Sequence, residues 1–263
     1  MQPPSHVGST PDPPALRLGT LDTKAGASPI IITSRTGASE TEAAILDAAA
    51  AVGRPIPTIV HLTLDVTSQA SVDAAAAEVR EKVGRLDILV NNAGFMGPEA
   101  SLLDQPTEEY VKTIDVNLTG VYRVTKALLP LMLEGGLRIV PIMGSAASLG
   151  AACAGAYTIT KFAMARFCQF LNLQYGDQGV CSFHYHPGGV STDLAQGLPG
   201  SFRKLLVDTP ELAGDTMVWL TAEKRTWLNG RYISANWDMV KLEGLKDKIV
   251  EKNLLKFKFD LDF

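Results

Sequence analysis

From residue 28 onward, short runs rich in β-branched residues alternate with longer runs of helical periodicity, and this alternation restricts the fold more than any other feature. The runs predict strands at residues 29–34, 58–66, 86–91, 138–143, 180–185 and 230–235, and helices at residues 40–52, 68–83, 107–133, 155–175 and 210–221. Because strand–helix–strand crossovers are right-handed, we expect an α/β fold with helices on both faces of the sheet. This is a Rossmann-like, doubly wound parallel sheet in three layers, α/β/α.

Length and composition set the organisation of the chain. A chain of 263 residues with 46% hydrophobic and 20% charged residues predicts a single domain over residues 15–263. Residues 1–14 are rich in proline and have neither the basic start nor the apolar run of a secretory signal, so we expect a disordered tail. A net charge of −4 argues against a nucleic-acid partner, and no run is apolar enough to cross a membrane. Three cysteines in apolar or small-residue surroundings indicate buried thiols and a reducing, cytoplasmic compartment: Cys153, Cys168 and Cys181.

One constellation of polar residues is expected at the carboxyl ends of the strands, where such sheets bind ligands. Tyr157 and Lys161 lie four residues apart and so share one side of a predicted helix. The pair Tyr122 and Lys126 has the same spacing, but only Tyr157 has a serine, Ser145, twelve residues before it at a strand end. We therefore expect a hydroxyl, a phenol and an ammonium to converge, so that a carbonyl could be held and protonated. The ammonium would lower a phenol pKa that starts near 10.

Five motifs in order carry a resemblance to a known family. They are residues 91–94 (Asn-Asn-Ala-Gly), Asn117, Ser145, the Tyr157/Lys161 pair and residues 187–192 (Pro-Gly-Gly-Val-Ser-Thr). Over residues 86–232 the chain resembles the short-chain dehydrogenase/reductase family, and residues 230–238 are similar to reductases common in filamentous fungi. The resemblance implies an enzyme that interconverts a carbonyl and an alcohol on a small organic molecule, with a place in a secondary pathway.

The resemblance also implies four catalytic residues. Tyr157 would be the general acid/base that protonates the carbonyl oxygen while hydride arrives from a nicotinamide. Lys161 would lower the pKa of Tyr157 and hold the ribose hydroxyls of the cofactor. Ser145 would orient and polarise the carbonyl, with Ser148 a distant second choice. Asn117 would hold a water that links Lys161 to solvent.

Residues for the cofactor follow from the same resemblance. Those at the adenosine ribose and the adenine would be Asn92, Ala93, Gly94 and Asp65, and those that close over the nicotinamide end would be Pro187, Gly188, Val190 and Thr192, with Tyr157 and Lys161 also in contact. Arg35, at the tip of a predicted strand, would clamp an adenosine 2′-phosphate, which favours NADP over NAD. Asp65 has a second interpretation, as an acid at the start of a helix.

The chain departs from the family in two places. Gly144 stands where the family usually has a second hydroxyl before its serine. The glycine-rich turn that holds the cofactor pyrophosphate is missing, and residues 36–39 share only its first letters. Charge-assisted contacts to the phosphates are therefore expected to be fewer.

The missing turn leaves two registers for the strand at residues 29–34. In the first register it is the second strand of the family, and a segment such as residues 15–21 must fill the central slot, because buried backbone groups would otherwise be unpaired. In the second register it takes the central slot itself, and residues 36–39 become a degenerate phosphate turn.

Three other features concern metal binding, access to the substrate and assembly. His184 and His186 face one way on a strand, but no third ligand follows, so we expect no metal. Residues 191–206 are a candidate lid over the substrate. Apolar side chains on an outer helix face, Phe162, Phe167 and Phe170, suggest a homodimer or a homotetramer. Two functions stay open: an NADP-dependent oxidoreductase, or a related binding or scaffold protein that lacks turnover.

Overall fold

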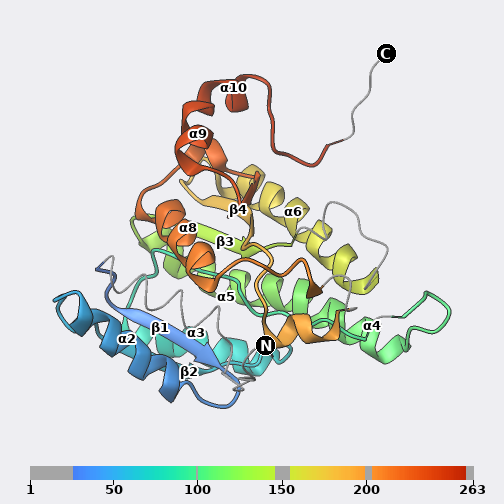
Figure 1. The fold of residues 1–263 in the computed structure, drawn as a ribbon. Coiled ribbons are helices and arrows are strands. Elements are labelled where there is room, and N and C mark those ends of the chain that lie inside the picture. Colours follow the sequence, from blue (N-terminus) through green and yellow to red (C-terminus); the bar gives the residue numbers. More distant parts are fainter. Residues whose placement is uncertain (1–25, 99, 146–154, 199–202, 259–263) are drawn as a thin grey trace, which may run out of the picture.

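The computed structural model describes residues 26–98, 100–145, 155–198 and 203–258. These residues form a single α/β domain whose parallel strands are covered by helices, as the alternation predicts (Figure 1). The predicted tail over residues 1–14 and the segment at residues 15–21 lie outside the described residues, as do Ser148 and Cys153.

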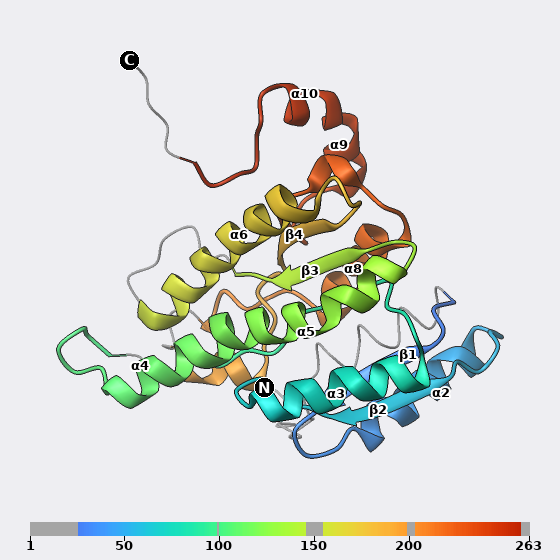
Figure 2. The same cartoon turned by 180° about the vertical axis from the view of Figure 1, so that it is seen from behind.

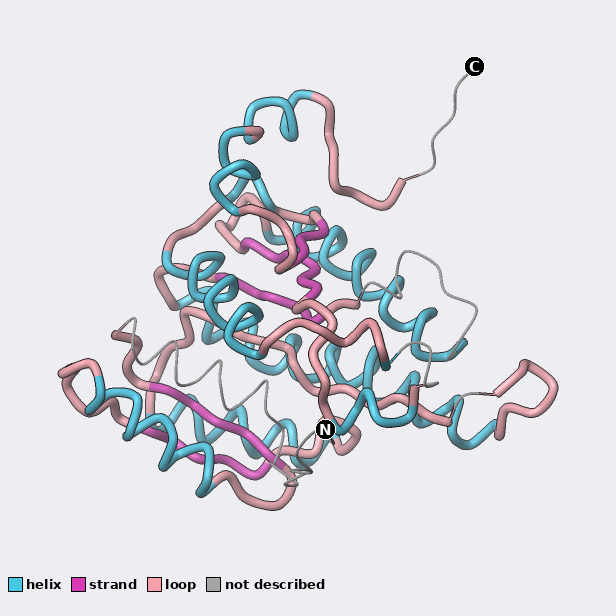
Figure 3. The backbone as a smooth tube through the Cα atoms, in the orientation of Figure 1, coloured by secondary structure: helices cyan, strands magenta, loops and turns pink. Residues whose placement is uncertain are grey.

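The strands form two blocks. β1 (Ile30–Ser34) pairs in parallel with β2 (Ile59–Thr63). β3 (Ile139–Met143), β4 (Cys181–His186) and β5 (Tyr232–Ser234) form a second parallel block in the order β3-β4-β5. Figure 3 shows the two blocks as separate groups of magenta strands.

The predicted strand at residues 86–91 extends the second block only in part. The amides of Leu89 and Asn91 each donate a hydrogen bond of 3.0 Å, to the carbonyls of Ile139 and Pro141 of β3. Along this segment the parallel pairing is limited to isolated bridges. A continuous strand was therefore too strong a prediction: Pro141 of β3 has no N–H to donate to the carbonyl of Leu89, so the ladder is interrupted there.

Among the described residues, a cavity of about 2080 Å³ lies between β1 and the segment at residues 86–95, and both line it. β1 pairs with β2 and, among the described residues, with no other strand, which is the arrangement of the first register. Only Ile30 of β1 is buried: Ile31 and Ile32 are half-buried and Thr33 is exposed, because they face this cavity or solvent, which a run of three isoleucines does not lead one to expect.

Helices cover both faces of the strands. Their bounds are α2 (Ser39–Ala51), α3 (Gln69–Lys82), α4 (Thr107–Ile114), α5 (Val121–Glu134), α6 (Gly155–Tyr175), α8 (Pro210–Ala222), α9 (Met239–Gly244) and α10 (Lys246–Glu251). α2 and α8 lie on one face in Figure 1, and α3, α5 and α6 lie on the other in Figure 2. Local signals fix several starts: Ser68 caps α3, and Thr209 caps α8 directly before Pro210.

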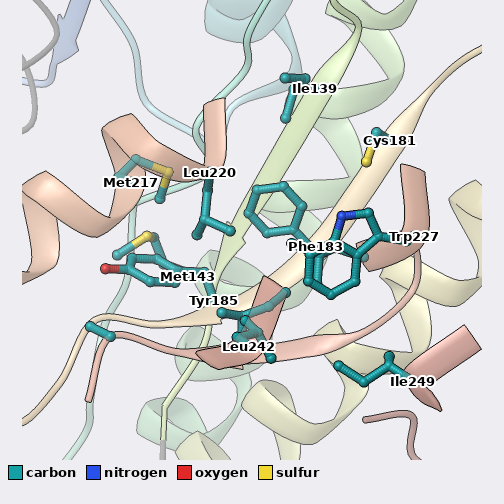
Figure 4. Packing of buried hydrophobic residues seen from close by; sticks show 13 residues of the cluster. Ile139, Met143, Cys181, Phe183, Tyr185, Met217, Leu220, Trp227, Leu242 and Ile249 are labelled. Carbon is teal, nitrogen blue, oxygen red and sulfur yellow. The ribbon is translucent and has the colours of Figure 1, made fainter. Parts of the chain in front are cut away.

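The core is divided by β4, whose side chains alternate between two faces. Phe183 and Tyr185 pack toward α8 with Met217 and Leu220 (Figure 4). The Tyr185 hydroxyl donates a hydrogen bond of 2.6 Å to the carbonyl of Ala213 on that helix. On the opposite face, Cys168 of α6 packs with residues of β3 and α5, and both it and Cys181 are free and buried, as predicted. The face of β4 that contains Ser182 and His184 therefore lies against α6.

Candidate active site

The predicted hydroxyl, phenol and ammonium meet at the carboxyl edge of the sheet. Tyr157 and Lys161 lie in the first two turns of α6, and Ser145 follows the end of β3 by two residues. A side-chain hydrogen bond joins Ser145 to Tyr157. The Lys161 ammonium lies 5.3 Å from the centre of the Tyr157 ring and donates a hydrogen bond of 2.9 Å to the carbonyl of Met143. The structure thus brings together the three groups that sequence spacing selected.

Burial dominates the ionisation of these groups. It raises the pKa of Tyr157 to about 12, against the opposing effect of the hydrogen bond to Ser145. It also lowers the pKa of Lys161, which is 4% exposed, to about 8. The expected lowering of the Tyr157 pKa by Lys161 is not seen, because burial of the phenol outweighs it and the ammonium is hydrogen-bonded to Met143. The phenol is therefore protonated at neutral pH.

Asn117 lies in a π-helical turn, η1 (Asp115–Gly120), between α4 and α5. The sequence predicted one helix over residues 107–133, and the π turn is the difference; such turns often occur at functional sites. The Asn117 amide oxygen accepts a hydrogen bond of 2.7 Å from the backbone of Phe95. Its amide nitrogen donates to the Phe95 carbonyl at 2.8 Å and to the Thr160 hydroxyl at 3.1 Å. Asn117 therefore ties the loop after residues 86–91 to α6, next to Lys161, and its contact with a water stays a prediction.

Gly94 connects this cluster to the cavity. A Cβ atom at Gly94 would lie 3.7 Å from the Asn117 amide oxygen and 3.8 Å from the Lys161 ammonium. The loop of Asn92, Ala93 and Gly94 also lines the cavity between the two blocks of strands. This loop therefore passes directly from the cavity to the cluster of Ser145, Tyr157 and Lys161.

The residues predicted at the adenosine end all line that cavity: Arg35, Asp65, Asn92, Ala93 and Gly94. Arg35 is exposed and close enough to Asp65 to lower the pKa of its carboxyl. The larger causes are hydrogen bonds from Thr67, whose amide and hydroxyl donate to Asp65 at 2.9 and 2.7 Å. Asp65 thus organises the turn before α3, as expected from its second interpretation as an acid at the start of a helix. It also lines the cavity.

Residues 36–39 form a weak candidate for the phosphate turn. The Gly37 amide donates a hydrogen bond of 3.0 Å to the Ser34 hydroxyl, so it is engaged within the turn. Arg35, Asp65 and the loop of residues 92–94 line one cavity and supply polar groups for an adenosine ribose. The described residues supply no glycine-rich cradle for a pyrophosphate, so the adenosine end fits the cofactor better than the phosphate bridge does.

The residues predicted at the nicotinamide end lie in the loop that leaves β4: Pro187, Gly188, Val190 and Thr192. Gly188 has a φ of +92°, a conformation that favours glycine. Val190 is buried and forms a parallel bridge with Asp208, which follows the predicted lid. Thr192 caps the short helix η3 (Asp193–Gly197) by accepting a hydrogen bond from the Ala195 amide. Asp208 was missed by sequence reasoning, because its partners are distant along the chain.

His184 fills the space beside Gly144. A Cβ atom at Gly144 would lie 2.7 Å from Cε1 and 2.8 Å from Cδ2 of the His184 ring, so no larger residue fits there without movement. Both ring nitrogens of His184 are buried without a hydrogen-bond partner. Burial, with further contributions from Lys161 and His186, lowers the pKa of His184 to about 3. Across the part of the chain that is described, no cluster of three or more His, Cys, Asp or Glu side chains could hold a metal ion.

Comparisons with known proteins identify the class. The family model described as enoyl-(acyl carrier protein) reductase matches residues 23–235. A short chain dehydrogenase of Monascus purpureus, mpl6, is 45% identical over 239 residues, which cover 90% of this chain and 82% of that protein. The short chain dehydrogenase pigC of Monascus ruber is 41% identical over 240 residues, covering 90% and 79%.

Solved structures give the same answer for the fold. A gluconate 5-dehydrogenase from Burkholderia cenocepacia, in complex with NADP and tartrate, is 25% identical with a TM-score of 0.72 and covers 83% of this chain and 88% of its own. A 7α-hydroxysteroid dehydrogenase complexed with NADH and 7-oxo glycochenodeoxycholic acid is 20% identical with a TM-score of 0.70, covering 83% and 86%.

The chain belongs to the short-chain dehydrogenase/reductase family, which consists of oxidoreductases that bind a nicotinamide cofactor and act on alcohol and carbonyl groups. Within the described ranges, no helix combines the length and apolarity needed to cross a bilayer.

Proposed function

We propose that this protein is an NADP-dependent oxidoreductase that interconverts a carbonyl and an alcohol on a small organic substrate. The observation that carries the proposal is the cluster in which Ser145 is hydrogen-bonded to Tyr157 while the buried Lys161 ammonium lies 5.3 Å from the ring of that tyrosine. A hydroxyl next to a protonated phenol can hold a carbonyl oxygen and then protonate it.

The chain's own residues divide the work as follows. A bound nicotinamide cofactor would supply the hydride. The Ser145 hydroxyl donates a hydrogen bond to the carbonyl oxygen and orients it, and the Tyr157 phenol gives its proton to that oxygen. Lys161 then stabilises the phenolate, and Asn117 holds the loop of residues 92–95 against α6. Because burial raises the pKa of Tyr157, its phenol holds a proton at neutral pH and is available as the donor.

The choice of NADP rests on Arg35. Its guanidinium is exposed, always charged and located at the cavity, which suits recognition of a 2′-phosphate. The gluconate 5-dehydrogenase neighbour was solved with NADP, whereas the 7α-hydroxysteroid dehydrogenase was solved with NADH. The family thus accommodates either cofactor, and Arg35 supports NADP for this chain.

A second candidate function is a family member without turnover that serves as a binding or scaffold protein. The specific observation in its favour is that the described residues supply no glycine-rich turn for the phosphates: residues 36–39 follow a strand that is paired as in the first register, and their Gly37 amide is engaged by Ser34. Losing two charge-assisted contacts, at about 1.5 to 3 kcal/mol each, would weaken cofactor binding more than about a hundredfold.

Titration of NADPH against its own fluorescence tests the proposal. We expect saturation in the micromolar range and weaker binding of NADH. Arg35→Ala should weaken NADPH binding about tenfold and leave NADH binding nearly unchanged, because only NADPH has the 2′-phosphate. Arg80→Ala is the matched control, since Arg80 is an exposed arginine of α3 that pairs with Glu134. Failure of wild-type protein to bind NADPH at millimolar concentration would contradict the proposal and support the second candidate.

The setting of the enzyme is part of the same proposal. The free thiols of Cys168 and Cys181 support a reducing, cytoplasmic compartment, and relatives from Monascus, a filamentous fungus, support a secondary pathway. Phe162 and Phe170 are 50% and 42% exposed on α6, which supports a homodimer or a homotetramer. Phe167 is instead half-buried against the core, so it does not belong to that outer face. A monomeric mass by light scattering at micromolar protein would contradict the oligomer.

A further inference from the structure

The Asp208 carboxylate connects three segments that are distant in the sequence. Its Oδ2 accepts a hydrogen bond of 2.6 Å from the amide of Gly189, in the loop after β4. Both of its oxygens lie 2.9 Å from the side-chain nitrogen of Asn236, in the turn after β5. Asp208 itself lies two residues before α8, at the end of the segment that joins β4 to that helix.

The backbone strengthens this connection. The Asp208 amide donates a hydrogen bond of 3.0 Å to the Gly189 carbonyl, and Val190 forms a parallel bridge with Asp208. The two ends of the segment from residue 190 to residue 208 are therefore held side by side. The loop that leaves β4 is thus fixed to the residues directly before α8.

The two glycines of the loop leave room for Asp208 and for the backbone just before it. A Cβ atom at Gly188 would lie 2.8 Å from Oδ2 of Asp208, and one at Gly189 would lie 2.9 Å from the carbonyl of Leu205. Both distances are shorter than real Cβ contacts. The sequence assigned Gly188 to the cofactor, and the structure adds a local reason for glycine at this position: a side chain there would displace Asp208.

The charge of Asp208 matches its surroundings. Hydrogen bonds from Asn236 and from the Gly189 amide lower the pKa of this half-buried carboxyl, and nearby His186 acts in the same direction. The group is therefore ionised at neutral pH, and hydrogen bonds to a charged acceptor are stronger than neutral ones. Replacing the carboxylate by an amide weakens the connection even where the shape is kept.

We propose that Asp208 is a positioning residue, which clamps the loop of residues 187–192 to the residues directly before α8 and holds that loop in place over the nicotinamide end of the cofactor. The proposal rests on the proposed function, because it takes this loop to contact the cofactor. A loop held in its binding conformation loses less entropy when the ligand binds, so loss of the clamp appears as weaker binding.

Two variants and one control measure the effect. Asp208→Ala removes the clamp, and Asn236→Ala removes one of its partners at an exposed side chain, where the fold is expected to persist. We expect Asp208→Ala to raise the Kd of NADPH and the KM for the carbonyl about tenfold or more, with a smaller loss in kcat. Asp215→Asn, at an exposed position of α8, is expected to behave as wild type.

Trypsin gives a readout that needs no cofactor. Arg203 and Lys204 are exposed a few residues before Asp208. Loss of the clamp should therefore speed cleavage after them, as followed by the mass of the fragments. The double variant of Asp208 and Asn236 should behave as Asp208→Ala alone, because both substitutions break one connection.

The outcomes separate this proposal from the proposed function. Weaker NADPH binding together with faster cleavage in Asp208→Ala supports the clamp. If wild-type protein binds NADPH and Asp208→Ala binds it equally well, the positioning role is wrong and the proposed function stands. If wild-type protein binds no NADPH, both are wrong. Should Asp208→Ala fail to fold, unchanged NADPH binding and unchanged cleavage in Asn236→Ala would overturn the clamp.

Discussion

Acid should destabilise this protein through His184. The imidazole is 1% exposed on β4, its two ring nitrogens have no partner, and its pKa is lowered to about 3 by burial, by Lys161 and by His186. An unfolded histidine titrates near 6.5. Because the folded-state pKa is the lower one, the unfolded chain binds more protons between these values, and stability is lost as the pH falls below about 6.5.

The size of the loss follows from the two pKa values. At pH 5 the unfolded histidine is almost fully protonated and the folded one is neutral. This difference in proton binding lowers the free energy of unfolding by about 2 kcal/mol at pH 5 relative to pH 8. This figure depends on the unfolded pKa alone as long as the folded value stays below about 4. His186, whose pKa burial also lowers, adds to the loss.

Urea unfolding at pH 8 and pH 5 measures this effect. For His184→Asn, the free energy of unfolding should fall between the two pH values by about 2 kcal/mol less than for wild-type protein. His61→Asn, at an exposed residue of β2, controls for removal of a histidine and should match wild type. Equal losses in His184→Asn and wild type would refute the assignment of a buried, neutral imidazole.

Three further predictions follow from the site. Gly144→Ala should lower the free energy of unfolding by about 1 to 3 kcal/mol, because the methyl group meets the His184 ring. In a His184→Ala background the same substitution should lower the free energy of unfolding by less. Additive losses in this double-mutant cycle would contradict the contact. Carbonyl reduction should decline as the pH rises through about 8, where Lys161 loses its charge, and Lys161→Arg should move that decline to higher pH; an unmoved decline would exclude Lys161 as its cause. Asn117→Ala should lower kcat about tenfold or more and speed amide exchange at Phe95, since the two hydrogen bonds to Phe95 are lost; unchanged exchange would argue against the tie.

The elements with strong periodicity could be predicted from the sequence. α6 runs from Gly155 to Tyr175, as predicted, because a long periodic run suffices to define a helix. The convergence of Ser145, Tyr157 and Lys161 could also be predicted, since a strand end and the next helix start are brought together by the topology. Local pattern and chain order contain that information.

Features that depend on distant partners could not be predicted. The π turn at Asn117 reflects hydrogen bonds to Phe95 and Thr160, which no local pattern shows. The pKa of Tyr157 reflects its burial in the folded chain rather than its distance from Lys161 along the sequence. Asp208 belongs to the same class, because its partners become neighbours only in the folded chain.

The central claim is that the Tyr157 phenol gives the proton to the carbonyl oxygen. The direct measurement is the rate of carbonyl-dependent NADPH oxidation for Tyr157→Phe beside Tyr122→Phe, whose tyrosine has the same spacing to a lysine but lies exposed on α5. We expect Tyr157→Phe to lose turnover by about 10² or more, with NADPH affinity and fold nearly unchanged, and Tyr122→Phe to turn over as wild type. Full activity in Tyr157→Phe would contradict proton transfer from this phenol.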